Sequence, residues 1–161
     1  RIRKVKGDAH CRFDALSREY RYAVYQQKDP LLNDRSYYFP FPLDLEKLNE
    51  AASVLLQSTD FESFSKRNTQ VAHFRCELIK SEWKWEDSEL VYRVVGNRFL
   101  RGMVRGMVGT MLKLGRGRMN LNDFKRIIDA KDVTGADFSV PGHGLMLMKV
   151  NYPDGYFESV E

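Results

Sequence analysis

The stretch that most constrains the fold reads Asn97-Arg98-Phe99-Leu100-Arg101-Gly102-Met103-Val104-Arg105-Gly106-Met107-Val108-Gly109-Thr110. Its apolar residues recur in two adjacent rows with the four-residue spacing of one helix face. The rows are Phe99, Met103, Met107 and Met111, and Leu100, Val104, Val108 and Leu112. The pattern predicts a strongly amphipathic helix over residues 98–115, with one side packed against the rest of the molecule.

Three glycines in this predicted helix require a structural reason, because each costs about 1 kcal/mol relative to alanine. Gly102, Gly106 and Gly109 follow one another at spacings of four and three residues, so they lie along one side. We therefore expect the helix to approach a sheet or a neighbouring helix closely on that side.

Arg101 and Arg105 are one turn apart on the predicted helix and would project together. Apolar residues surround the base of Arg105, so we expect its guanidinium to be partly desolvated. A guanidinium in such a position usually binds a carboxylate or a phosphate. The alternative interpretation is an ordinary packed helix whose arginines are solvated.

Alternating and helical apolar patterns define the other elements. The predicted strands cover residues 18–25, 75–85, 90–97 and 144–150, and the further predicted helices cover residues 45–57 and 121–130. We expect the last strand to be mostly buried. The order of elements predicts an α+β fold with one mainly antiparallel sheet and helices packed on one face. At 161 residues, the chain is expected to be a single domain over residues 1–161.

Positive charge is concentrated in two segments. Residues 1–6 and 98–118 contain ten lysines and arginines and no acidic residue, whereas the rest of the chain has 16 bases against 22 acids. Segregation of this kind is typical of proteins that bind nucleic acid or phosphate groups. On charge alone, two solvated surfaces are an equally good explanation.

Several protein classes are excluded by the sequence. No apolar run approaches the length of a membrane-spanning helix, and we expect a soluble, cytoplasmic protein. Cys11 and Cys76 have neither the number nor the spacing of a disulfide framework or a metal site, so we expect no bound metal. Walker A, Gly-x-Ser-x-Gly and Rossmann motifs are also absent, which argues against the NTPase, hydrolase and dinucleotide-binding classes.

Arginines alternate with aromatic residues in the segment from His10 to Tyr22. Such a segment is typical of a platform for single-stranded RNA, on which rings stack against bases and guanidinium groups bind phosphates. The alternative is the packing of tyrosines within a sheet. Tyr20 and Tyr22 fall on the same strand face, so we expect them to share an environment.

Four motifs together resemble the tRNA pseudouridine synthase A family. They are Arg12-Phe13-Asp14-Ala15-x-Ser17-Arg18-x-Tyr20-Arg21-Tyr22, Asp60-Phe61-x-Ser63-Phe64, the stretch from Asn97 to Gly109, and Gly144-Leu145-x-Leu147-x-x-Val150-x-Tyr152-Pro153. They span nearly the whole chain in the order and spacing of the family. The resemblance implies a pseudouridine synthase fold, of which this chain would form one half, similar to an RNA-recognition motif.

The resemblance also implies an activity. Members convert uridines on the 3′ side of the tRNA anticodon stem and loop to pseudouridine without a cofactor, and they form homodimers. Their nucleophilic aspartate lies in an Arg-Thr-Asp motif, which does not occur in this sequence. Since the chain also begins with Arg1 rather than Met, we expect it to be the C-terminal half of a longer protein and to be inactive alone.

Residue roles follow from the same resemblance. Tyr20 would stack on or near the target base, Arg105 would pair with the nucleophilic aspartate, and Leu145 would line the site below the base. The expected tRNA contacts are Arg12, Arg18, Arg21, Lys66, Arg67, Arg98 and Arg101. A non-catalytic RNA-binding module on the same scaffold and a structural dimerisation domain are the alternatives.

Overall fold

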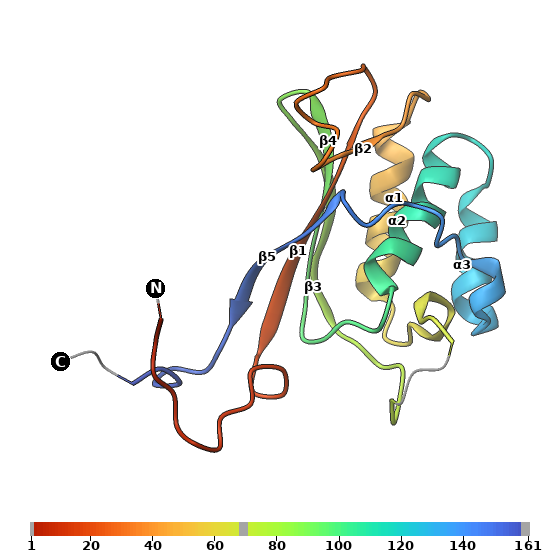
Figure 1. The fold of residues 1–161 in the computed structure, drawn as a ribbon. Coiled ribbons are helices and arrows are strands. Elements are labelled where there is room, and N and C mark those ends of the chain that lie inside the picture. Colours follow the sequence, from red (N-terminus) through yellow and green to blue (C-terminus); the bar gives the residue numbers. More distant parts are fainter. Residues whose placement is uncertain (1, 68–70, 159–161) are drawn as a thin grey trace.

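The computed structural model describes residues 2–67 and 71–158. Within this range, five strands form one sheet and three α-helices cover one of its faces (Figure 1). The strands are β1 (Ser17–Tyr25), β2 (Tyr37–Tyr38), β3 (Leu78–Glu86), β4 (Glu89–Gly96) and β5 (Leu145–Asn151). The helices are α1 (Leu45–Gln57), α2 (Met103–Gly115) and α3 (Leu121–Ala130), with short 3₁₀ turns at Glu62–Phe64 and Val133–Gly135. The predicted α+β class with helices on one face is confirmed.

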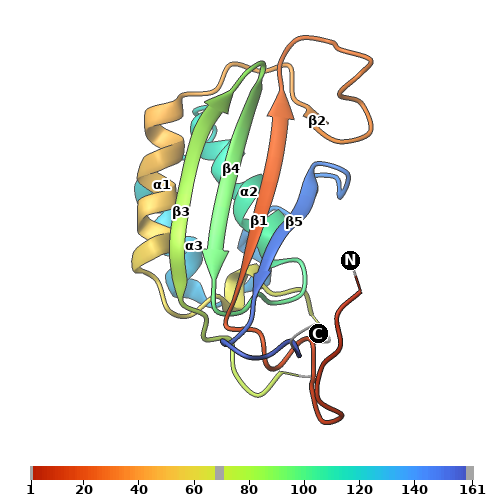
Figure 2. The same cartoon turned by 90° about the vertical axis from the view of Figure 1, so that its left-hand side faces the viewer.

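β1 lies at the centre of the sheet. It pairs antiparallel with β4, which in turn pairs antiparallel with β3. On its other side, β1 pairs antiparallel with β5 and, at Val24 and Tyr25, parallel with β2 (Figure 2). The sheet is therefore mainly antiparallel, as predicted. β2 was not predicted, because two residues are too few to show an alternating pattern.

The core fills the space between the sheet and the helices. α1 begins where the side chain of Asp44 accepts a hydrogen bond from the backbone N–H of Lys47, and α3 begins at a capping box built on Asn120. Both caps agree with the predicted helix starts. Most of the buried apolar side chains form one continuous cluster. None of the helices in the described residues is long and apolar enough to cross a membrane.

The prediction that residues 144–150 form a mostly buried strand is wrong in one respect. The strand is present as β5, but Leu147 is 54% exposed and Met148 is 48% exposed. β5 lies at an edge of the sheet, and its far end extends beyond the helices (Figure 1). Its apolar residues therefore have little to pack against.

The helix predicted over residues 98–115 begins five residues later, at Met103. Gly102 precedes it with a φ of +79°, a left-handed conformation that interrupts the helix and favours glycine. Arg101 consequently lies in the preceding turn, and the prediction that it projects from the helix one turn from Arg105 is wrong. The apolar rows were continuous across this turn, so periodicity alone did not reveal it.

Gly106 and Gly109 do allow a close approach, as predicted, but the neighbour is neither a sheet nor a helix. A side chain at Gly106 would lie 2.7 Å from the ring of Phe138, and one at Gly109 would collide with the carbonyl oxygen of Asp137. The irregular segment of residues 137–141, here called the strap, therefore lies directly against α2.

Candidate functional site

A cleft of about 770 Å³ opens at the N-terminal end of β1. Its described lining residues come from three segments of the chain: Arg12, Phe13, Ala15, Leu16, Arg18, Tyr20, Val71, Ala72, Asn97, Arg98 and Phe99. We call it the Tyr20 cleft. Three of these residues are arginines and none is acidic, so the lining is positively charged. Four of the predicted site residues, Arg12, Arg18, Tyr20 and Arg98, are thus brought together.

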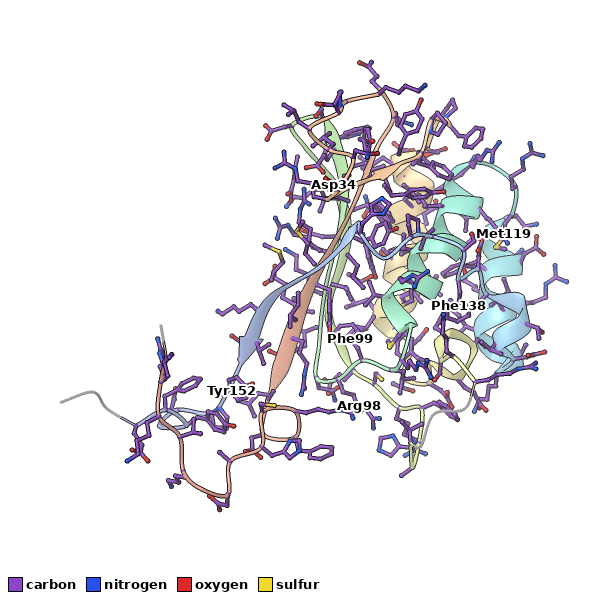
Figure 3. All side chains as sticks on the ribbon, viewed as in Figure 1. Asp34, Arg98, Phe99, Met119, Phe138 and Tyr152 are labelled. Carbon is purple, nitrogen blue, oxygen red and sulfur yellow. The ribbon has the colours of Figure 1, made fainter. Side chains whose placement is uncertain are left out.

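Tyr20 is half-buried within this cleft. Its ring meets the edge of Phe99 with the centroids 5.0 Å apart, and Phe99 comes from the turn between β4 and α2 (Figure 3). Tyr22, on the same strand face, is fully buried, and its hydroxyl donates to the carbonyl of Pro141 at 2.7 Å. Burial raises the pKa of Tyr22 above its ordinary value. Of the two tyrosines, Tyr20 is the one that a ligand can reach.

Arg18 supports the wall of the cleft. Its guanidinium donates to the backbone carbonyls of Ala15 at 3.0 Å and of Asn97 at 2.6 Å, and also to that of Arg12. These bonds connect the segment before β1 to the turn after β4. Most of the hydrogen-bonding capacity of Arg18 is therefore used within the protein.

Arg105 is half-buried on α2 and is oriented by the strap. Its Nε donates to the carbonyl of Val140 at 2.8 Å, and its Nη2 donates to that of Phe138 at 3.2 Å. Arg105 forms no ion pair with any residue in the described ranges, and its Nη1 has no hydrogen-bond partner there. Neutral carbonyls orient a guanidinium without cancelling its charge, so the Nη1 side can bind an anion.

The strap is itself held on α2. The backbone N–H of Asp137 donates to the hydroxyl of Thr110 at 3.0 Å, and the side chain of Asp137 pairs with Lys113 at 3.1 Å. The strap was not predicted as part of the site. Gly106 and Gly109 indicated a close approach to this side of α2, but the sequence did not indicate which segment makes it.

Leu145 lies opposite Tyr22 in the ladder between β1 and β5. Residues directly opposite one another point to the same sheet face, so Leu145 shares the face of Tyr20 and Tyr22. Arg105 is close enough to Tyr22 to interact with it electrostatically. Tyr20 and Leu145 thus share a sheet face with the buried Tyr22, and Arg105 approaches the same face from α2.

A second basic group lies near the turn before α2. The backbone N–H of Lys66 donates to the carbonyl of Arg101 at 2.9 Å, and the aliphatic part of its side chain lies over Gly102. Lys66, Arg67 and Lys131 line a separate cavity of about 300 Å³. Its lining also includes Glu62 and Asp132, so its charge is more mixed than that of the Tyr20 cleft.

Arg21 is not part of either group. It points to the opposite face of the sheet, where its Nη2 lies 2.7 Å from Glu89 and its Nε lies 3.6 Å from Glu86. Only 12% of its side chain is exposed. Its position therefore fits a structural ion pair rather than the expected contact with tRNA.

The described residues contain no group of three or more His, Cys, Asp and Glu side chains that could hold a metal ion. The described residues offer a phenol at Tyr20, a guanidinium with free donors at Arg105 and an apolar side chain at Leu145, beside a basic cleft.

Comparisons with known proteins identify the family. A family model described as tRNA pseudouridine synthase matches residues 51–153. The chain is 45% identical over 157 residues to tRNA pseudouridine synthase A of Parabacteroides distasonis, covering 98% of this chain and 62% of that protein. It is 42% identical over 159 residues to the enzyme of the same name from Bacteroides fragilis, covering 98% of this chain and 63% of the relative. A relative from Bacillus velezensis is 39% identical over 145 residues, covering 89% of this chain and 59% of its own length.

The chain therefore spans about three fifths of the length of these relatives. The matched region includes α2, the strap and β5, which together hold Arg105 and Leu145. The chain belongs to the tRNA pseudouridine synthase family.

Proposed function

We propose that this chain is the part of a tRNA pseudouridine synthase that binds tRNA and supplies supporting residues to the active site. One observation carries the proposal: Tyr20, which shares a sheet face with Leu145, lies in a cleft whose described lining residues include three arginines and no acidic residue. A cleft of that charge suits a polyanion.

The reaction is an isomerisation. The bond between N1 of uracil and the ribose breaks, the base rotates, and a new bond joins the ribose to C5, whose hydrogen is released as a proton while N1 gains one. Atoms and charge balance without an oxidant or reductant, so the reaction requires no redox cofactor. A target within a stem must first leave the base stack, which a basic cleft with an aromatic wall assists.

Each residue has a role in this proposal. Tyr20 stacks on or near the target uracil, and Leu145 provides an apolar surface below it. The nucleophilic aspartate implied by the family resemblance comes from another part of the protein and meets the free Nη1 side of Arg105. Pairing with a guanidinium keeps a carboxylate ionised and fixes its direction.

Contact with tRNA is assigned to Arg12 and Arg98 in the cleft and to Lys66, Arg67 and Arg101 beside it. Arg18 acts indirectly, because its guanidinium holds the cleft wall. We also propose that the whole protein is a cytoplasmic homodimer, as the family resemblance implies. Size-exclusion chromatography with light scattering tests the dimer.

The test of the catalytic role uses a protein of the full length of the relatives. Pseudouridine formation is measured in single turnover as tritium released from C5 of labelled uridine in unmodified tRNA. We expect Tyr20→Leu to lower the rate by at least about 100-fold. Tyr20→Phe then separates stacking from proton transfer, because it keeps the ring and removes the hydroxyl.

Tyr38→Leu is the matched control, since Tyr38 packs against Tyr25 at the opposite end of β1. Its rate is expected to equal that of the wild type. An unchanged rate in Tyr20→Leu would remove Tyr20 from the site. If the wild-type protein bound tRNA but formed no pseudouridine, the alternative of a non-catalytic RNA-binding module would replace the proposed enzyme.

A further inference from the structure

Phe13 is a large apolar side chain in an unusual place. Its ring lines the Tyr20 cleft and is 74% exposed. Tyr20, in the same cleft, is only half-exposed and packs against Phe99. Phe13 thus contributes little to the core, and its ring is available to whatever enters the cleft.

The turn that carries Phe13 is well ordered by hydrogen bonds. Nδ1 of His10 accepts from the backbone N–H groups of both Arg12 and Phe13, each at 3.2 Å. The carboxylate of Asp14 accepts from the backbone N–H of His10 at 2.6 Å. Arg18 binds the carbonyls on either side of Phe13, those of Arg12 and Ala15. Because the backbone of the turn is fixed in this way, only the side chain of Phe13 has to be ordered when a ligand stacks on it.

The neighbours of the ring also favour a particular ligand. The His10 ring lies 4.2 Å from that of Phe13, and the Arg12 guanidinium lies 5.7 Å from its centroid. An exposed aromatic face beside arginines, in a cleft whose described lining has no carboxylate, suits a flat base attached to a phosphate. Every nucleotide of an RNA carries both a base and a phosphate, whereas a protein segment would match this cleft only where an apolar residue stands next to acidic ones.

We propose that Phe13 is a stacking platform for an unpaired nucleobase of the RNA, adjacent to the base that reaches Tyr20. This inference rests on the proposed function, because it takes RNA as the occupant of the cleft. Stacking holds the single-stranded backbone in the cleft, and Arg12 binds a neighbouring phosphate. Phe13 is therefore a binding residue that favours substrates with unstacked bases near the target.

The test measures the binding of this chain to two fluorescent RNAs, a hairpin with an unpaired loop and a fully paired duplex of the same length. We expect Phe13→Ala to weaken hairpin binding by about 5- to 150-fold, the range for loss of one stacked base. Duplex binding is expected to change little. Phe13→Trp should retain hairpin binding, because it keeps an aromatic face.

Salt dependence separates stacking from charge. Phe13→Ala removes no phosphate contact, so the slope of log affinity against log salt concentration should match that of the wild type. Arg12→Gln should reduce that slope by about one. Leu31→Ala is the control for loss of exposed apolar surface, because Leu31 is 81% exposed and lines neither basic cavity.

If Phe13→Ala left the affinity for the hairpin unchanged, or lowered the affinities for hairpin and duplex equally, the proposal that Phe13 is a stacking platform would be wrong. The proposed function would remain intact. An unfolding temperature far below that of the wild type would also overturn it, because the ring would then be structural. If the wild-type chain bound neither RNA, the RNA-binding part of the proposed function would itself be wrong.

Discussion

Arg105 and Arg21 are both partly buried arginines, but they lie on opposite faces of the sheet and have different partners. Arg105, on the helical side, is held by the carbonyls of Phe138 and Val140. Arg21, on the open side shown in Figure 2, is held by the carboxylates of Glu89 and Glu86. A carbonyl directs a guanidinium, whereas a carboxylate also neutralises it.

The difference shows that partial burial of an arginine does not by itself indicate a functional site. The paired arginine stabilises the sheet and has no charge left for a ligand. The arginine among carbonyls keeps its full charge in a site with reduced access to water, where it attracts an anion more strongly than it would in solution. The partners distinguish the two roles.

The largest expected effect is on the reaction rate, when Arg105 is replaced. In the full-length protein, Arg105→Ala is expected to lower single-turnover pseudouridine formation by about 100- to 1,000-fold, the usual loss for one preorganised charged donor. Arg105→Lys should not restore the rate, because an ammonium cannot bind both strap carbonyls and still present a free edge.

Arg21→Ala is the matched variant on the open face. Its rate is expected to stay within about threefold of the wild type, while its unfolding free energy falls because Glu89 loses its partner. A fully active Arg105→Ala protein, or an inactive and stably folded Arg21→Ala protein, would contradict the assignment of the two arginines.

A smaller effect is expected where the strap lies against α2. The Cβ of Gly109→Ala would collide with the carbonyl oxygen of Asp137, so the strap or the helix must shift. We expect a loss of about 1–3 kcal/mol in the free energy of unfolding, measured by urea denaturation. In the full-length protein the shift should also lower the rate while KM changes little, because the strap orients Arg105.

Gly142→Ala provides the control next to the strap. Nothing lies within 4 Å of a Cβ built on Gly142, and its φ is not in the left-handed region. Its stability and rate are expected to equal or slightly exceed those of the wild type. Equal losses in both glycine variants would show that the fit between α2 and the strap is not the cause.

The smallest effect is a pH dependence of stability that arises on the open face. A hydrogen bond from Arg93 to Glu86, with Nε and Oε1 2.7 Å apart, holds the pKa of that carboxyl below its ordinary value of 4.5. Stabilisation from a lowered carboxyl pKa is complete above the unfolded pKa and is lost as the pH falls through the folded one.

The unfolding free energy should therefore decrease as the pH falls from about 5 to about 3, and Arg93→Gln should make that decrease shallower. Urea denaturation at a series of pH values measures both slopes. Arg105→Gln should leave the slope unchanged, since Arg105 pairs with carbonyls and not with a carboxylate. An equal change of slope in both variants would remove the distinction between the two faces.

Much of the fold was predictable from local patterns. α1 and α3 begin directly after their caps, Asp44 and Asn120, in agreement with the helices expected over residues 45–57 and 121–130. The hairpin of β3 and β4 agrees with the strands expected over residues 75–85 and 90–97. The start of α2 was not predictable from periodicity, because the apolar rows continue unchanged through Gly102. The left-handed backbone of Gly102 prevents the helix from starting before Met103.

The sequence by itself determined the type and order of the main elements, the positively charged segments and the family, because these depend on local periodicity, composition and linear motifs. Only the tertiary structure decided that Arg105 meets carbonyls while Arg21 meets carboxylates, and that the Tyr20 cleft joins residues 12–20 to residues 97–99. The physical reason is that both outcomes depend on contacts between segments far apart in the chain, and no local pattern encodes which segment will be the neighbour.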